Sequence, residues 1–179
     1  VICSHSMFGS TIKLIGSEFA KFGVQTTFVS QTQVAEWKAA MQPNTRLLFA
    51  ETPTNPLTEV CDIKALAEIA HAGHALLVVD NCFATPYLQQ PIKYGADLVV
   101  HSATKLIDGQ GRVLGGVAVG RADLIREIYL FSRNTGPSLS PFNSWILSKS
   151  LETLCVRVDK HCENALAVAG FLEKEAKVN

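Results

Sequence analysis

Short apolar runs of strand length alternate along this chain with stretches that have the apolar spacing of amphipathic helices. Ser10–Phe22 carries apolar residues three and four positions apart, and the strand-like run Thr26–Val29 follows it. This alternation is typical of a mostly parallel sheet flanked by helices on both faces. The pattern therefore predicts an α/β fold.

The same alternation continues along most of the chain. Further strands are expected at Arg46–Ala50, Leu76–Val79 and Leu98–Val100, with a short strand that ends at Val119. Further helices are expected at Thr32–Met41, Asp62–Ala72 and Ala122–Phe131, with Thr32 and Asp62 as caps. From Pro141 onward the chain reads as two helical pieces that share an apolar stripe of Leu147, Leu151, Leu154 and Val158.

Length and charge exclude several classes of protein. A chain of 179 residues is long enough for one sizeable core. Sixteen basic residues balance sixteen acidic ones, and no basic run stands out, so neither nucleic acid nor an anionic membrane is expected as a partner. Hydrophobic residues make up 47% of the chain, which suggests that some apolar surface is covered in a homo-oligomer.

The five cysteines give no sign of a disulfide framework or a metal site. They are odd in number, scattered, and form no C-x-x-C pair, so a reducing cytosol is the simplest setting. The apolar runs are too short to span a bilayer. Because the chain starts at Val1 and stops at Asn179 inside an expected helix, we interpret it as part of a longer polypeptide, truncated at both ends.

Lys105 closes the string His101-Ser102-Ala103-Thr104-Lys105, just beyond an expected strand end. A lone lysine on a loop is usually a solvated charge. An amine whose pKa is lowered can instead form a Schiff base with an aldehyde cofactor. The hydroxyls of Ser102 and Thr104 would suit the phosphate of such a cofactor.

Asp80 follows the apolar strand Leu76–Val79, where a carboxylate is costly unless a cation or hydrogen-bond donors meet it. A helix cap or a salt bridge is the ordinary explanation. The alternative is that Asp80 keeps a pyridinium nitrogen protonated. Ligands bind beyond the carboxyl ends of strands in open α/β sheets, and the strand ends before Asp80 and Lys105 can be adjacent or separated by one strand. The pair is more informative than either residue alone.

Two further residues lie where a flat cofactor could reach them. Asn55, within Thr52–Pro56, could donate to a ring hydroxyl, although an Asn-Pro turn explains it equally well. Phe8 precedes the first helix and could stack on a ring, although an isolated phenylalanine is more often core. The glycines at 109, 111, 115 and 116 spell no nucleotide-binding motif and are interpreted as turns.

Taken together, these residues resemble the Cys/Met-metabolism family of pyridoxal-phosphate (PLP) enzymes. The resemblance covers essentially the whole chain, and Gly109-Gln110-Gly111-Arg112 and Asn81-Cys82-Phe83 are most similar to its O-succinylhomoserine sulfhydrylase branch. The strongest matching segments are Glu51-Thr52-Pro53-Thr54-Asn55-Pro56, Val79-Asp80-Asn81, His101-Ser102-Ala103-Thr104-Lys105, Ser140-Pro141-Phe142 and Leu151-Glu152-Thr153-Leu154.

The resemblance implies a role for each candidate residue. Lys105 would hold PLP and act as the catalytic residue, and Asp80 would pair with the ring nitrogen. The other cofactor contacts would be Ser102 and Thr104 to the phosphate, Asn55 to the ring oxygen, Phe8 in place of a stacking tyrosine, and Cys82 in place of a threonine near the ring.

The resemblance also implies the architecture and the reaction. The fold would be the large domain of an aspartate-aminotransferase-like, fold type I enzyme, with residues 1–160 as its central part and 161–179 as the start of a helix toward a C-terminal domain. The reaction would be γ-replacement on O-succinylhomoserine by sulfide to give homocysteine, for methionine biosynthesis, in a cytoplasmic homotetramer. Cystathionine synthesis and γ- or β-elimination remain alternatives with the same cofactor. A non-catalytic nucleotide-binding module is the alternative of another class.

Overall fold

The computed structural model describes residues 1–178, which form two compact units. The first unit comprises residues 1–102 and 116–138, and the second comprises 103–115 and 139 onward. Each unit is built around its own apolar cluster.

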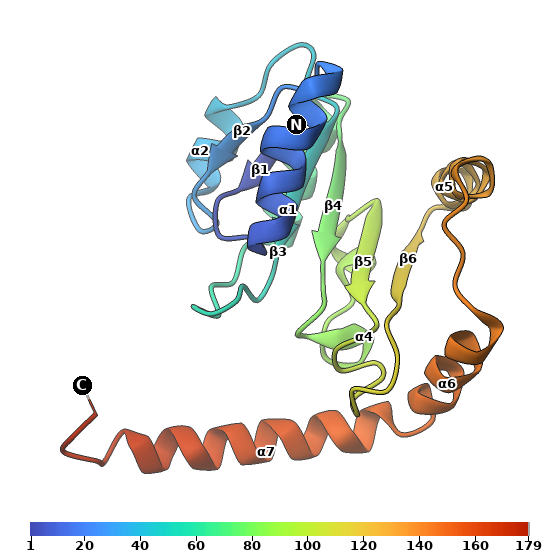
Figure 1. Cartoon of the computed structure of the whole chain (residues 1–179). Coiled ribbons are helices and arrows are strands. Elements are labelled where there is room, and N and C mark those ends of the chain that lie inside the picture. The colour runs from blue at the N-terminus through green and yellow to red at the C-terminus, as the bar shows by residue number, and fades with distance from the viewer. Residues whose placement is uncertain (179) are drawn as a thin grey trace. The chain divides into compact units, whose positions relative to one another are not determined.

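The first unit contains a six-stranded sheet in the order β2-β1-β3-β4-β5-β6 (Figure 1). The first five strands pair in parallel, and β6 runs antiparallel to β5, as the mostly parallel prediction requires. The strands are β1 (Ile2–Ser4), β2 (Thr27–Val29), β3 (Leu47–Glu51), β4 (Leu76–Asp80), β5 (Leu98–Ser102) and β6 (Gly116–Gly120). The sequence analysis did not predict β1.

Apolar side chains pack on both faces of this sheet. On one face, Leu48 and Leu77 pack with Trp37 of α2 (Val34–Ala39) and Leu66 of α3 (Ile63–Ala72). On the other face, Cys3 and Phe49 pack with Ile15, in the helical segment that begins with α1 (Gly9–Lys13). The predicted layers are therefore present.

The helical segment after Phe8 is irregular. It continues from α1 through the π-helical turn η1 (Leu14–Glu18) and the 3-10 turn η2 (Phe19–Phe22) to Gly23, whose φ is 83°. The expected helix is present, but its amphipathic face is incomplete, because Phe22 is 84% exposed whereas Ile15 is buried.

The two predicted caps had different outcomes. Asp62 caps α3, since its side chain accepts a hydrogen bond from the Ala65 N–H at 3.0 Å. The prediction for Thr32 was wrong by one residue: Gln33 is the N-cap residue of α2, and its side chain makes no capping hydrogen bond. In place of that hydrogen bond, the Glu36 carboxylate accepts the N–H of Ser30 at 2.8 Å.

Short helical elements complete the first unit. The sequence pattern did not predict α4 (Thr85–Leu88) or the 3-10 turn η3 (Pro91–Tyr94), which lie between β4 and β5. The long helix α5 (Ala122–Thr135) follows β6 and extends four residues beyond its predicted end.

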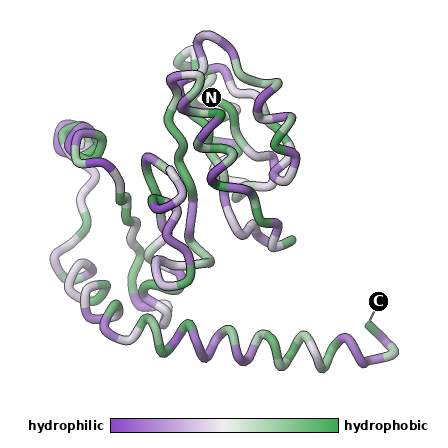
Figure 2. Tube along the Cα trace, turned by 180° about the vertical axis from the view of Figure 1, so that it is seen from behind, coloured by the Kyte–Doolittle hydropathy of each residue, from purple (hydrophilic) through white to green (hydrophobic). Residues whose placement is uncertain are grey.

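The second unit consists of the 103–115 segment and two helices, α6 (Pro141–Leu151) and α7 (Leu154–Leu172). The predicted stripe is largely confirmed, because Leu147, Leu154 and Val158 are buried. Leu151, the last residue of α6, is 49% exposed, although it lies one turn after the buried Leu147. Figure 2 shows hydrophobic and hydrophilic residues alternating along α7.

The boundary expected after residue 160 lies inside α7, so it does not coincide with the end of a helix. The division into 1–160 and 161–179 stays a prediction. Within residues 1–178, no helix has the combination of length and apolar character needed to cross a bilayer.

Candidate functional site

Polar side chains gather where β3, β4 and β5 end. These three strands are neighbours, with Glu51 paired to Asp80 and Asp80 paired to Val100. The open question about strand order is thereby answered, since the strand that ends at Asp80 is adjacent to the strand that leads toward Lys105. Ser102 is the last residue of β5, two positions beyond Val100.

Because the sheet is pleated, three of these side chains point to the same face. Side chains alternate between faces along a strand, and Leu77, Val79 and Val99 belong to the core that contains α2 and α3. Asp80, its partner Glu51 and the in-phase residue Ser102 must therefore point to the opposite face. That face is the one covered by the helical segment that follows Phe8.

Asp80 is partly buried and lacks a cationic partner. Its Oδ1 accepts a hydrogen bond from the Cys82 N–H at 3.0 Å. Burial raises the pKa of Asp80, and the Cys82 hydrogen bond offsets only part of that effect. No lysine, arginine or histidine among residues 1–178 forms an ion pair with Asp80.

Glu51 is a second carboxylate at this edge, and it is 3% exposed. Its Oε2 accepts the Phe8 N–H at 2.8 Å. Burial raises the pKa of Glu51 and the neighbouring charge of Asp80 adds to the rise, while the main-chain N–H groups of Phe8 and Asn55 oppose it. Glu51 thus connects the segments that contain Phe8 and Asn55 to the end of β3. The sequence analysis missed this role, although an acidic residue at the end of an apolar strand is the same signal that identified Asp80.

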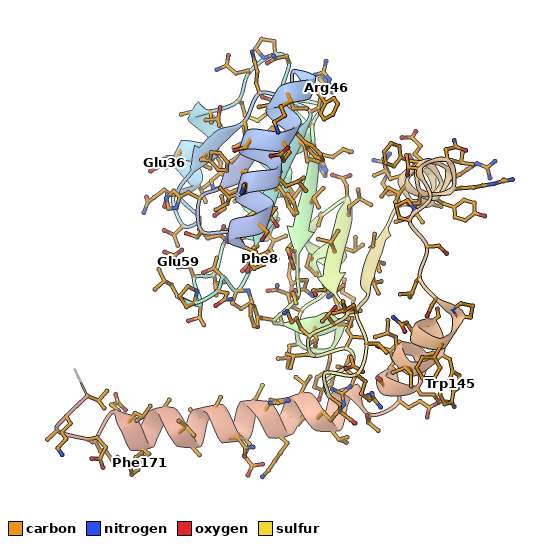
Figure 3. The ribbon with its side chains drawn as sticks, viewed as in Figure 1. Phe8, Glu36, Arg46, Glu59, Trp145 and Phe171 are labelled. Carbon is orange, nitrogen blue, oxygen red and sulfur yellow. The ribbon has the colours of Figure 1, made fainter. Side chains whose placement is uncertain are left out.

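Phe8 and Asn55 both lie at this edge with exposed side chains. Phe8 is 57% exposed, and in Figure 3 it lies at the end of the sheet toward which the arrowheads of β4 and β5 point. Asn55 lies in the loop that follows β3. Asn55 lines a pocket of about 550 Å³, together with other residues from the segments 53–58 and 83–89. The lining of this pocket does not include Asp80 or Ser102.

Cys82 and Ser102 come together across the ends of β4 and β5. The Cys82 Sγ lies 3.6 Å from the Ser102 carbonyl oxygen, within the reach of a weak thiol hydrogen bond. The Ser102 hydroxyl makes no hydrogen bond to another group of the described chain and so retains its full donor and acceptor capacity.

Asn81 fixes the loop that follows Asp80, a role that the sequence analysis also missed. It is fully buried, and its amide donates to the carbonyl oxygens of Thr85 at 3.0 Å and Gln89 at 2.8 Å. The Gln89 amide in turn donates to Asn81 Oδ1 at 2.7 Å and to the Thr52 carbonyl at 3.0 Å. This amide pair connects the loops after β3 and β4.

Thr104 and Lys105 belong to the second unit, although they follow Ser102 closely in the chain. The Thr104 hydroxyl accepts the Gly115 N–H at 3.0 Å and lies 3.3 Å from the Gly115 carbonyl oxygen. Lys105 is exposed, so its own unit does not provide the desolvation that would activate an amine. The structure thus brings Phe8, Asn55, Asp80, Cys82 and Ser102 to one edge of the first unit. Thr104 and Lys105 belong to the second unit.

One observation in particular indicates that the first unit fits a pyridoxal-phosphate ring. A partly buried carboxylate, Asp80, has a main-chain donor on one oxygen and forms no ion pair with another of residues 1–178. Such a group is unfavourable by itself and is stabilised by a protonated ring nitrogen. Ser102 adds a hydroxyl on the same face of the sheet.

Comparisons with known proteins agree with this fit. The chain is 55% identical over 175 residues to the O-succinylhomoserine sulfhydrylase of Pseudomonas aeruginosa, which covers 98% of this chain and 43% of that protein. It is 40% identical over 181 residues to the L-methionine gamma-lyase of Porphyromonas gingivalis, covering 99% of this chain and 45% of that protein. The chain therefore spans less than half the length of these curated relatives.

A solved structure gives the same answer for the fold. The cystathionine gamma-lyase of Lactobacillus plantarum, solved in complex with L-serine, matches with a TM-score of 0.95 and 35% identity over 99% of this chain and 47% of that one. The prediction of a fold type I α/β architecture is confirmed. Because the family of Cys/Met metabolism PLP-dependent enzymes matches residues 1–179, this chain belongs to that family.

Proposed function

We propose that this chain forms the cofactor-binding part of an enzyme that replaces the succinyloxy group of O-succinylhomoserine with sulfide. In the overall reaction the Cγ–O bond breaks, a Cγ–S bond forms, and homocysteine and succinate are released. The observation that carries the proposal is the 55% identity to the O-succinylhomoserine sulfhydrylase of Pseudomonas aeruginosa. The substrate is a small amino acid ester, and a homotetramer in the cytoplasm stays part of the proposal.

Elimination is the second candidate reaction, because the L-methionine gamma-lyase of Porphyromonas gingivalis is 40% identical to the chain. Cystathionine synthesis stays an alternative as well. The comparisons give no support to a non-catalytic nucleotide-binding module, since the matching family consists of PLP-dependent enzymes.

Asp80 is proposed to hold the proton of the ring nitrogen. When bound, pyridoxal phosphate supplies an electron-accepting ring that stabilises negative charge on a substrate carbon. Asp80 supports this chemistry because an ionised carboxylate beside the nitrogen favours its protonated form. Burial limits the solvent screening of Asp80, which strengthens its interaction with a cation.

Lys105 is proposed to hold the cofactor covalently and then to carry protons at the substrate carbons. Its exposed amine, at the end of the His101–Lys105 string, is accessible for both tasks. Ser102 and Thr104 are proposed to bind the phosphate, and Asn55 to contact the ring oxygen. Phe8 is proposed to stack on the ring and Cys82 to lie beside it. Phe8 has no hydroxyl, so it cannot take part in proton transfer.

We predict that Lys105→Ala abolishes covalent attachment of the cofactor, because its amine is the proposed attachment point. Borohydride reduction of the native protein, followed by peptide mapping, should place the pyridoxyl group on Lys105. Lys93→Ala and Lys149→Ala serve as matched controls and should retain the near-visible absorption band of the bound cofactor. A reduced label on Lys93 or Lys149 would contradict the assignment.

We predict that Asp80→Asn leaves the cofactor attached but slows turnover by about 10²-fold or more, because a neutral amide does not hold a proton on the ring nitrogen. The measurement is kcat together with the cofactor content of the purified protein. Asp62→Asn is a suitable control, since asparagine preserves the cap of α3 and should leave kcat unchanged. Near-normal turnover of Asp80→Asn would assign the ring nitrogen to another residue.

We predict that the protein, expressed with any sequence that flanks this chain in its gene, converts O-succinylhomoserine and sulfide mainly to homocysteine. With phenylalanine at position 8, one acid that could assist elimination is missing from the ring face. Both products are assayed, first with sulfide and then with cysteine as the donor. Mostly 2-oxobutyrate in the sulfide assay would identify a lyase, and efficient formation of cystathionine from cysteine would identify a synthase.

A further inference from the structure

Several hydrogen bonds hold the turn that carries Lys105. The Asp108 N–H donates to the Ala103 carbonyl at 2.8 Å, and the Gly109 N–H donates to the Lys105 carbonyl at 2.7 Å. Two main-chain hydrogen bonds alone would leave such a short turn mobile, because they offset little of the entropy lost when the turn is ordered. Additional contacts must hold it in place.

Arg157 of α7 supplies the first of these contacts. Its Nη1 donates to the Leu106 carbonyl at 2.7 Å, and its Nη2 donates to the Ile107 carbonyl at 3.0 Å. The same guanidinium donates to the Ser150 carbonyl at 2.9 Å and to the Thr153 hydroxyl at 3.1 Å. A planar group with five donors is suited to bridging several carbonyl oxygens at once. Arg157 thus links the turn to the junction of α6 and α7.

Gly109 makes room for this contact. A Cβ atom at position 109 would collide with the Arg157 guanidinium, and the backbone φ of Gly109 is 73°, which disfavours other residues. Both the positive φ and the close approach of Arg157 therefore favour glycine at position 109.

A second connection joins the other end of the turn to α6. Asp108 is fully buried and accepts hydrogen bonds from the Arg112 N–H at 2.7 Å and from its Nε at 3.0 Å. The Arg112 guanidinium also donates to the Ser150 hydroxyl at 2.6 Å. Arg112 and Arg157 thus bind adjacent residues of one short segment, and both contact Ser150.

Most main-chain carbonyl groups around Lys105 are consequently paired. The carbonyl oxygens of residues 103, 105, 106, 107 and 108 all accept hydrogen bonds, while the side chain of Lys105 remains exposed. A fixed main chain beneath a free amine limits the positions that the amine can reach. Such an arrangement suits a nucleophile that must meet a carbonyl carbon in a defined direction.

We propose that Arg157 is a positioning residue for Lys105. By fixing the carbonyl groups of Leu106 and Ile107, it orients the Lys105 amine for covalent attachment to the cofactor. The inference rests on the proposed function of Lys105 as the attachment point, and it assigns the α6–α7 junction a role in presenting that lysine.

The test compares Arg157→Met and Arg157→Lys with the matched control Lys160→Met in the protein expressed with any flanking sequence of its gene. Lys160 lies on the same helix, and its exposed pair with Glu163 at 2.8 Å contributes little. Two quantities are measured. One is hydrogen exchange of the Asp108 and Gly109 amides without cofactor, and the other is the rate at which the near-visible band appears when pyridoxal phosphate is added.

For Arg157→Met we expect amide exchange at least about tenfold faster and cofactor attachment at least about tenfold slower, because two charge-assisted hydrogen bonds to the turn are lost. Arg157→Lys should give intermediate values, since an ammonium group retains the charge but lacks the planar fork. Lys160→Met should match the native protein in both measurements.

Attachment at the native rate in both Arg157 variants, with faster exchange of the turn, would reduce Arg157 to a structural role and overturn the inference. If Arg157→Met does not fold, Arg157→Lys decides between the two results. Failure of the proposed function is seen separately, because borohydride would then label a lysine other than Lys105 in the native protein.

Discussion

The parallel register of β3, β4 and β5 is the constraint on which the site in the first unit depends. It pairs Glu51 with Asp80 and places Ser102 in phase with them, so all three side chains point to the face covered by the segment after Phe8. A shift of one residue in β4 would send Asp80 to the opposite face, into the apolar core. The apolar residues that precede Asp80, among them Leu77 and Val79, fix the register because they fill that core.

This arrangement has a cost in stability. Burial raises the pKa values of both Glu51 and Asp80, and each lies beside another acidic group. A carboxyl group whose folded pKa is raised reduces stability at pH values above that pKa, and the loss disappears below its ordinary value. Glu51 is compensated by the main-chain N–H groups of two residues, whereas within residues 1–178 Asp80 accepts a hydrogen bond only from the Cys82 N–H. Asp80, the less compensated carboxylate, is the one proposed to pair with the protonated ring nitrogen of the cofactor. Functional groups are often those whose interactions the fold itself leaves incomplete.

Local patterns predicted the parts of the structure that depend on local physics. Apolar runs located β3, β4 and β5, and Asp62 was identified as a cap because its hydrogen bond spans three residues. The contacts of Glu51 and Arg157 could not be predicted, since they join residues 43 and about 50 positions apart. The predicted Thr32 cap was wrong by one residue, and Leu151 of the predicted apolar stripe is exposed. The positions of Lys105 and Asp80 at strand ends followed from the sequence, but their roles stay predictions.

The protonation state of the cofactor's ring nitrogen tests the central claim most directly. Nitrogen-15 NMR of the protein loaded with ring-labelled pyridoxal phosphate, recorded near pH 8, reports that state without measuring activity. The account predicts a protonated nitrogen in the native protein and an unprotonated one in Asp80→Asn, because the ionised carboxylate is what favours the ring proton. A nitrogen that is protonated to the same extent in both proteins, or in neither, would contradict the account.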